Sequence, residues 1–150
     1  MNNLNEIKKF KDWKNSWTNK DSLGLIDYIS FNIHPDDMLI IYNLFSPEFI
    51  EVEDCIFISF NYDFQSYTNL SLNTKYNKKE IEKTINRIHI YDIFSNCEDL
   101  VDEIIFENIG KSLQKLWSNK LKSIYPNREL FVDLIIDSNE YGPIITIYQK

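Results

Sequence analysis

The sequence predicts an α+β fold, in which an antiparallel sheet of about four strands packs against several helices. Two segments, 47–63 and 130–148, alternate apolar and polar residues with the period of two that is typical of strands, and each contains a turn signal. Segments with a period near 3.6 precede the first hairpin and separate it from the second. Because strands and helices do not alternate regularly, we expect antiparallel hairpins and no parallel sheet.

The composition favours one folded domain over residues 1–150. Hydrophobic residues make up 43% of the 150 residues and aromatic residues 15%, which is enough for a core. Only three Gly and four Pro leave little material for phosphate-binding loops, and no catalytic or cofactor motif occurs. We therefore expect no cofactor and no bound metal. Cys55 and Cys97 lack CxxC spacing, so we expect two reduced thiols that are buried or half-buried.

The charge and the terminus restrict the kinds of partner. Residues 1–17 have no apolar core run or cleavage site of a secretory signal, and no segment approaches the roughly 20 apolar residues that span a bilayer. We expect a cytoplasmic protein with no membrane partner. The formal net charge of -7 disfavours direct binding to nucleic acid, because phosphate binding needs clustered Lys and Arg. A basic protein partner is favoured instead.

Three helices are expected before the first hairpin. Apolar residues at three- and four-residue steps predict an amphipathic helix over about residues 3–16, and a short second helix follows over 21–29. The third helix has Pro35 in its first turn, together with Asp36 and Asp37, where the helix dipole favours negative charge. In the hairpin over 47–63 that follows, the alternation predicts one apolar face and one mixed face.

The segments between the hairpins are less regular. Residues 64–77 show no clean period and predict a loop, with or without one extra strand. Asn77 is expected to cap a helix, and residues 87–94 either end this helix or form a short strand. The strongest helix signal runs from Asn96 to Ile124, with acids in its early turns and lysines in its later ones.

Acidic residues are concentrated in two parts of the chain. Residues 21–74 contain nine acids and no Lys or Arg, and residues 92–110 contain six acids and no Lys or Arg. Ordinary solvated turns and strand edges are one explanation, and a surface for a basic partner is the other. On the second interpretation, the acids that steer the partner are Asp36, Asp37, Glu51, Glu53, Asp54, Asp63, Asp92, Asp99, Asp102 and Glu103, and the aromatic residues that supply a desolvated centre are Phe57 and Tyr62.

A weaker signal suggests chemistry at His89 and Asp92. The His-x-x-Asp spacing is ligand-like, but zinc requires three or four ligands and no others can be named. A small hydrolase or transferase that uses His89, Asp92 and a carboxylate near the first hairpin is therefore a second hypothesis. A histidine satisfied by a neighbouring polar group is the simpler interpretation.

Two segments indicate the class of protein to which the chain is similar, LFSPEFIEVEDCIFISF at 44–60 and INRIHIYDIF at 85–94. In a small, acidic, cysteine-poor chain without a catalytic motif, they resemble the immunity proteins of bacterial polymorphic toxin and contact-dependent inhibition systems. The resemblance implies a protein without catalysis that blocks a cognate toxin domain. Such toxins are often basic nucleases, which suits an acidic inhibitor that imitates phosphate charge. A regulatory binding domain unrelated to toxins is the remaining alternative.

Overall fold

The computed structural model describes residues 4–97, 100–137 and 139–150. The chain divides into two compact units, residues 1–42 and 43–150. The α+β class is confirmed, and the strands form two antiparallel sheets of two and three strands in place of one sheet. The expected single domain over 1–150 stays a prediction.

The first unit is helical, as the apolar periodicity predicts. Trp13 and Tyr28 pack their rings perpendicular to each other at 5.2 Å between centroids, and Phe10 lies 5.4 Å from Tyr28. The first helix begins later than expected, because the backbone at Ile7 is extended. The helical elements up to the start of the second unit are a 3-10 turn at Leu4–Glu6, α1 at Lys8–Asn15, a 3-10 turn at Lys20–Ser22, α2 at Leu25–Asn32 and α3 at Pro35–Phe45.

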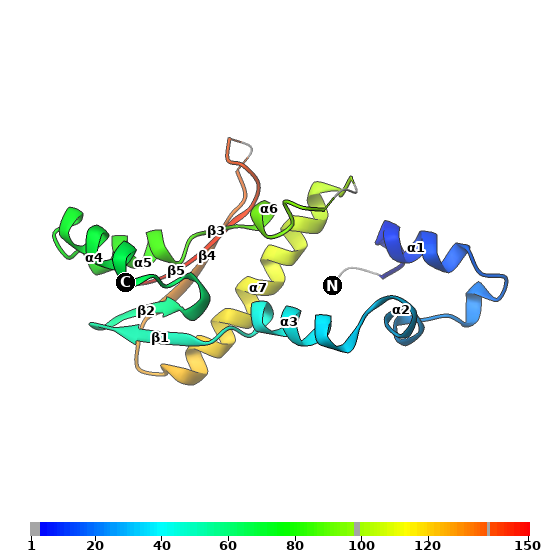
Figure 1. The fold of residues 1–150 in the computed structure, drawn as a ribbon, viewed down its shortest axis with the longest axis horizontal. Coiled ribbons are helices and arrows are strands. Elements are labelled where there is room, and N and C mark those ends of the chain that lie inside the picture. Colours follow the sequence, from blue (N-terminus) through cyan, green and yellow to red (C-terminus); the bar gives the residue numbers. More distant parts are fainter. Residues whose placement is uncertain (1–3, 98–99, 138) are drawn as a thin grey trace. The chain divides into compact units, whose positions relative to one another are not determined.

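The second unit contains both sheets (Figure 1). Its elements are β1 at Phe49–Val52, β2 at Cys55–Ile58, a 3-10 turn at Ser59–Asn61, α4 at Phe64–Asn73, α5 at Lys78–Ile85, β3 at Ile88–His89, α6 at Ile90–Ile93, α7 at Glu103–Ile124, β4 at Leu130–Ile135 and β5 at Ile144–Gln149. One sheet is the β1–β2 hairpin, and the other has the order β3-β5-β4. Both predicted hairpins are present, with antiparallel register. The first is shorter than the predicted 47–63, because β2 ends at Ile58 and a 3-10 turn follows at Ser59–Asn61.

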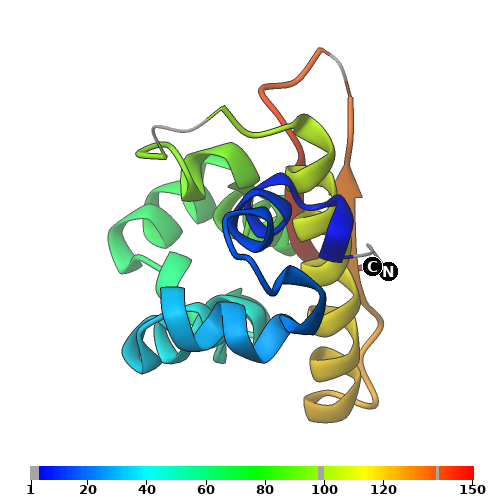
Figure 2. The same cartoon turned by 90° about the vertical axis from the view of Figure 1, so that its right-hand side faces the viewer.

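The main core lies between α7 and the strands. Figure 2 shows α7 running beside β4, and its Leu113, Trp117 and Leu121 are fully buried. Trp117 Nε1 donates a hydrogen bond of 3.0 Å to the Leu44 carbonyl, so the largest buried side chain has its one polar atom satisfied. A Cβ on Gly110 would lie 2.7 Å from a methyl of the β4 residue Leu134. Glycine at this position therefore permits the close approach of helix and strand.

The segment 64–77, predicted as a loop, contains the helix α4, so that prediction is wrong. Asp63 is the N-cap, and its carboxylate accepts a hydrogen bond of 2.7 Å from the Ser66 amide. The buried face of α4 is narrow and is centred on Tyr67, whose ring lies 5.7 Å from that of Phe57. A helix with so few apolar positions gives almost no periodic signal.

The helix α4 also corrects the prediction of one apolar and one mixed hairpin face. All four residues of β2 are buried. Ile56 and Ile58 belong to the main core, whereas Cys55 and Phe57 belong to a second core with Tyr67 of α4. The strand is therefore covered on both sides, because α4 and α5 pack where the mixed face was expected to meet solvent.

The helix expected to begin at Asn96 begins at Glu103, after Asp102 in the N-cap position. The segment 87–94 contains the short strand β3 followed by the one-turn helix α6, so the strand alternative is the correct one for its start. The predicted acids Glu98 and Asp99 of this region lie outside the described residues.

A buried carboxylate on α5 joins the two sheets. Glu82 is fully buried, and its two oxygens accept hydrogen bonds of 2.7 Å from the Ile56 amide of β2, the Gln149 amide of β5 and the Gln149 side chain. The edge of β5 faces this carboxylate because β3 pairs only with Ile144 and Ile145. The carboxylate thus satisfies backbone groups that a continuous sheet would pair.

Asn86, one helical turn after Glu82, makes the same kind of connection. Its Oδ1 accepts from the Ile58 amide at 2.9 Å, and its Nδ2 donates to the carbonyls of Ile56 at 2.8 Å and Ile147 at 3.1 Å. The side chain is fully buried, and all three of these bonds go to backbone groups. Two polar side chains of one helix therefore replace the backbone ladder that would have merged the two hairpins into a single sheet.

Candidate functional site

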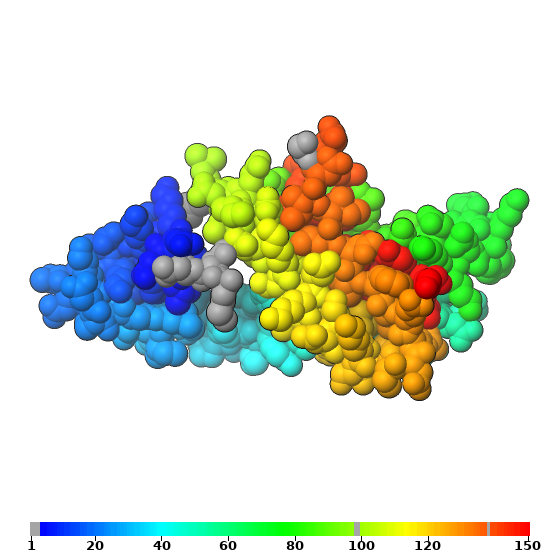
Figure 3. All heavy atoms as spheres, turned by 180° about the vertical axis from the view of Figure 1, so that it is seen from behind, coloured from blue at the N-terminus to red at the C-terminus, as the bar shows by residue number. Residues whose placement is uncertain are grey.

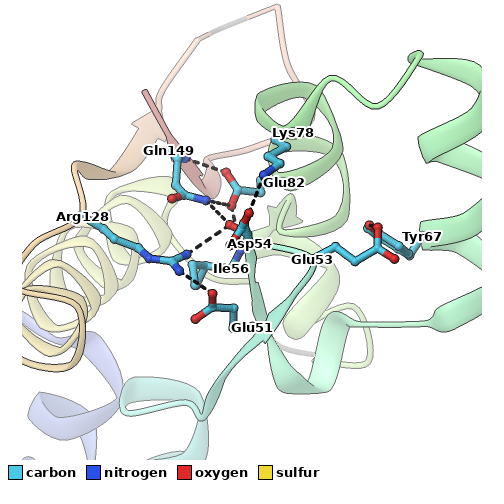
Figure 4. A network of polar contacts seen from close by, with 9 residues as sticks. All are labelled: Glu51, Glu53, Asp54, Ile56, Tyr67, Lys78, Glu82, Arg128 and Gln149. Carbon is cyan, nitrogen blue, oxygen red and sulfur yellow. Dashed lines mark hydrogen bonds and ion pairs between the residues drawn. The ribbon is translucent and has the colours of Figure 1, made fainter.

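The acids of the β1–β2 hairpin are bound to groups of their own chain. Glu53 and Asp54 form the turn with φ angles of 48° and 65°, which is the backbone of a two-residue hairpin turn. The partners of the three hairpin acids, drawn in Figure 4, are Arg128 for Glu51, the Tyr67 hydroxyl for Glu53 at 2.9 Å, and Lys78 for Asp54 at 3.0 Å. The hydrogen bond and charge of Lys78 lower the pKa of Asp54 below its usual value. These carboxylates hold the turn against α4, α5 and the segment before β4.

Three other predicted site residues have structural positions as well. Phe57 is fully buried and cannot form the centre of a partner surface, which corrects that prediction. Tyr62 is half-buried, with its ring 5.2 Å from that of Phe57. The Ser66 amide lowers the pKa of Asp63, as expected of an N-cap carboxylate. All three residues belong to the packing around α4.

The remaining acids of the predicted partner surface that lie in the described residues are exposed. Asp36 and Asp37 lie in the first turn of α3, as predicted. Asp92 lies in α6, and Asp102 and Glu103 lie at the start of α7. The predicted Asp99 lies outside the described residues. The structure therefore divides the predicted acidic surface into an internally bonded hairpin and separate exposed groups.

Four aromatic rings gather where α6, the start of α7 and the β4–β5 connection meet. Tyr91 is central, with its ring centroid 4.6 Å from Phe106 and 5.3 Å from Tyr141, and Phe94 lies 5.9 Å from Phe106. Tyr141 is 63% exposed and Phe94 37% exposed, so the cluster reaches the surface. Figure 3 shows the β4–β5 connection projecting beside the start of α7. We call these four rings, with Asp92, Asp102 and Glu103, the α6–α7 patch.

Backbone contacts hold the β4–β5 connection against the patch. Gly142 has a φ of 73°, and a Cβ there would lie 2.6 Å from the Tyr91 ring, so only glycine fits. The Ile90 amide donates to the Pro143 carbonyl at 2.9 Å, and Arg87 pairs with Glu140 at 3.3 Å. The exposed Tyr141 next to this glycine is thus presented by a defined backbone.

The carboxylates of the patch differ from those of the hairpin. Glu107 and Glu140 nearby are paired with Lys111 and Arg87, but within the described part of the chain no ion pair engages Asp92, Asp102 or Glu103. Burial and then the charge of Glu103 raise the pKa of Tyr91. The patch therefore combines exposed aromatic surface with three carboxylates that form no ion pair within the described residues.

At the base of this patch, both ring nitrogens of His89 have contacts within the chain. Its Nε2 accepts from Arg87 Nε at 3.3 Å, and its Nδ1 lies 3.2 Å from the Tyr141 carbonyl. These contacts are satisfied by the neutral tautomer with hydrogen on Nδ1. Among the residues that the structure describes, no group of three or more His, Cys, Asp or Glu could hold a metal ion.

The two thiols occupy different environments. Cys55 is buried in the second core, as expected, and burial first and the Glu82 charge second raise its pKa to about 11. Cys97 is exposed, which differs from the prediction of a buried or half-buried side chain.

No protein family model, no curated protein and no solved structure matches the chain. In the described residues, no helix is both long enough and apolar enough to cross a membrane.

The sequence contained part of the signal for the patch. The six acids without a base over 92–110 indicated an acidic surface, and the turn residues from Asp137 to Gly142 indicated the turn of the second hairpin. The gathering of Tyr91, Phe106 and Tyr141 could not be read from it, because the three residues come from separate elements.

Proposed function

We propose that the protein is a toxin-neutralising immunity protein, which binds a basic bacterial toxin domain and blocks it, with a nuclease as the favoured toxin. The observation that carries the proposal is the α6–α7 patch. Protein interfaces concentrate their binding energy in exposed aromatic residues, and complementary charge accelerates association. A basic nuclease presents the opposite charge, because it must itself bind phosphate.

The proposal moves the predicted interface away from the hairpin. Glu51, Glu53 and Asp54 each have a partner in the chain, so a toxin would have to compete with those partners for the carboxylates. Asp92, Asp102 and Glu103 have no ion pair within the described residues that a toxin would have to replace. Electrostatic steering by these three groups should weaken as salt is added, because their charges are exposed and screened.

The test is an affinity capture from the native host at low salt, followed by assay of the purified captured protein for nuclease activity and its inhibition. The patch variant carries Asp92→Asn, Asp102→Asn and Glu103→Gln. Asn at position 102 remains a good N-cap residue, so α7 should be retained. We expect wild type to capture and inhibit one basic toxin and the patch variant to bind it at least about tenfold more slowly at low salt.

A second variant, Asp36→Asn with Asp37→Asn and Glu48→Gln, removes the same number of exposed charges elsewhere. It should retain most of the association rate. Equal losses in the two variants would assign the effect to net charge, and a loss confined to the second variant would place the interface on α3. A captured partner without toxic activity would contradict the immunity function and favour a regulatory binding domain.

A further inference from the structure

A cavity beside the β1–β2 turn collects positive charge. It has a volume of about 280 Å³, and its lining comes from the hairpin turn, the start of α5, the segment before β4 and the end of β5. The lining residues are Asp54, Lys78, Lys79, Arg128, Gln149 and Lys150. Four of the six are cationic in a protein whose formal net charge is -7, and we call this cavity the Lys/Arg pocket.

Two walls of the Lys/Arg pocket are fixed by a backbone carbonyl. The Asp54 carbonyl accepts from Arg128 at 3.1 Å and from the Gln149 side chain at 2.7 Å. Gln149 is held a second time by the buried Glu82 carboxylate, as Figure 4 shows. Arg128 and Gln149 are therefore held by the backbone of Asp54, and these two hydrogen bonds do not involve its side-chain carboxylate.

Two of the cations have weak interactions within the chain. Lys79 Nζ lies 5.1 Å from the centre of the Tyr148 ring, and no ion pair to it occurs in the described part of the structure. Lys150 pairs with Glu129 at 3.3 Å, but the two side chains are 71% and 61% exposed. Such exposed pairs contribute little and exchange readily. Both ammonium groups can turn toward a bound anion at small cost.

We propose that the Lys/Arg pocket binds a small phosphate-type oxyanion, such as inorganic phosphate, pyrophosphate or a phosphate ester of similar size. Ammonium and guanidinium groups are the usual protein donors to phosphate oxygens. The volume of about 280 Å³ is large enough for an anion of this size. Asp54 is the one anionic residue among the lining residues named above, and the ligand competes with its carboxylate for Lys78. It also competes with Glu51 for Arg128 and with Glu129 for Lys150.

Because of this competition, the proposal predicts weaker anion binding for one variant and tighter anion binding for another. Pyrophosphate and phosphate are titrated into the full chain at low salt, with binding followed by amide chemical shifts around the pocket. The variant Lys79→Ala with Lys150→Ala should bind about tenfold more weakly, whereas Asp54→Asn should bind several-fold more tightly. Asn is tolerated at the positive φ of position 54, and the backbone carbonyl contacts remain.

The matched control is Lys8→Ala with Lys9→Ala, which removes two exposed lysines of α1. It should leave the dissociation constant unchanged, and the shifts should saturate. Shifts that do not saturate, or an equal loss in the control, would show an adventitious ion only and overturn the proposal. Weaker binding to Asp54→Asn would also overturn it, because the carboxylate would then be assisting the ligand.

Discussion

The buried Glu82 gives the sharpest prediction of stability. In Glu82→Gln the shape is kept, but one oxygen becomes an NH2 group that faces a donor, either the Gln149 amide or the pair of N–H groups on Oε1. An unsatisfied buried donor costs about 1–3 kcal/mol, and the remaining bonds lose roughly 1 kcal/mol each with the charge. Relief of the buried charge offsets a few kcal/mol of this.

We therefore expect Glu82→Gln to lower the free energy of unfolding by about 2 kcal/mol, and Tm by roughly 4–8 °C for a chain of this size. Glu82→Ala leaves all three donors without an acceptor and should cost about 4 kcal/mol. Thermal and urea unfolding measure both changes. Glu80→Gln, exposed on the same helix, removes the same charge and should stay within about 0.5 kcal/mol of wild type. Equal stability of the Glu80 and Glu82 glutamine variants would refute the bridging role.

Three further predictions concern other parts of the second unit. Gly142→Ala should cost about 1–3 kcal/mol through its positive φ and should slow partner association; unchanged stability and binding would contradict the close packing on the Tyr91 ring. In a native thiol titration at pH 8, Cys97 should react and Cys55 only after denaturation, because the pKa of Cys55 is raised to about 11. The neutral Cys55 thiol contributes fully to stability below the pKa of the unfolded state, and this contribution is lost as the pH rises toward 11. In Cys55→Ala, the free energy of unfolding should therefore fall less steeply over this alkaline range. Asp63→Ala should increase amide hydrogen exchange in α4, because the Ser66 amide loses its acceptor. Since the pKa of Asp63 is lowered, the exchange rates of wild type should approach those of the variant as the pH falls below about 4. Rapid exchange in both proteins at pH 7 would contradict the capping role.

The sequence predicted those helices and strands whose stabilising contacts involve residues close together in the chain. Pro35 with two following acids marked α3, and Asn77 marked α5, where its side chain accepts from the Glu80 amide at 3.3 Å. The alternation over 130–148 marked β4 and β5. In each case the physical cause lies within a few residues of the signal.

The remainder depended on partners distant in the chain. The charge count over 21–74 suggested an open acidic surface, but Glu51 is neutralised by Arg128, 77 residues later. Glu82 looked like any helical glutamate until β2 and β5 supplied three donors. The helix α4 was missed because its polar Ser, Thr and Asn residues give no period, although Tyr67 anchors it in the second core. Pairing and burial of this kind are set by tertiary contacts.

The side chains that bridge the two sheets also act as blocking groups. An open strand edge is a template on which another chain can add a strand, with aggregation or domain swapping as the result. Along the facing edges of β2 and β5, Glu82 and Asn86 already occupy the amides and carbonyls that an incoming strand would use. Loss of either side chain should therefore do more than lower stability, because it would leave these backbone groups open to pairing with another chain and should promote self-association.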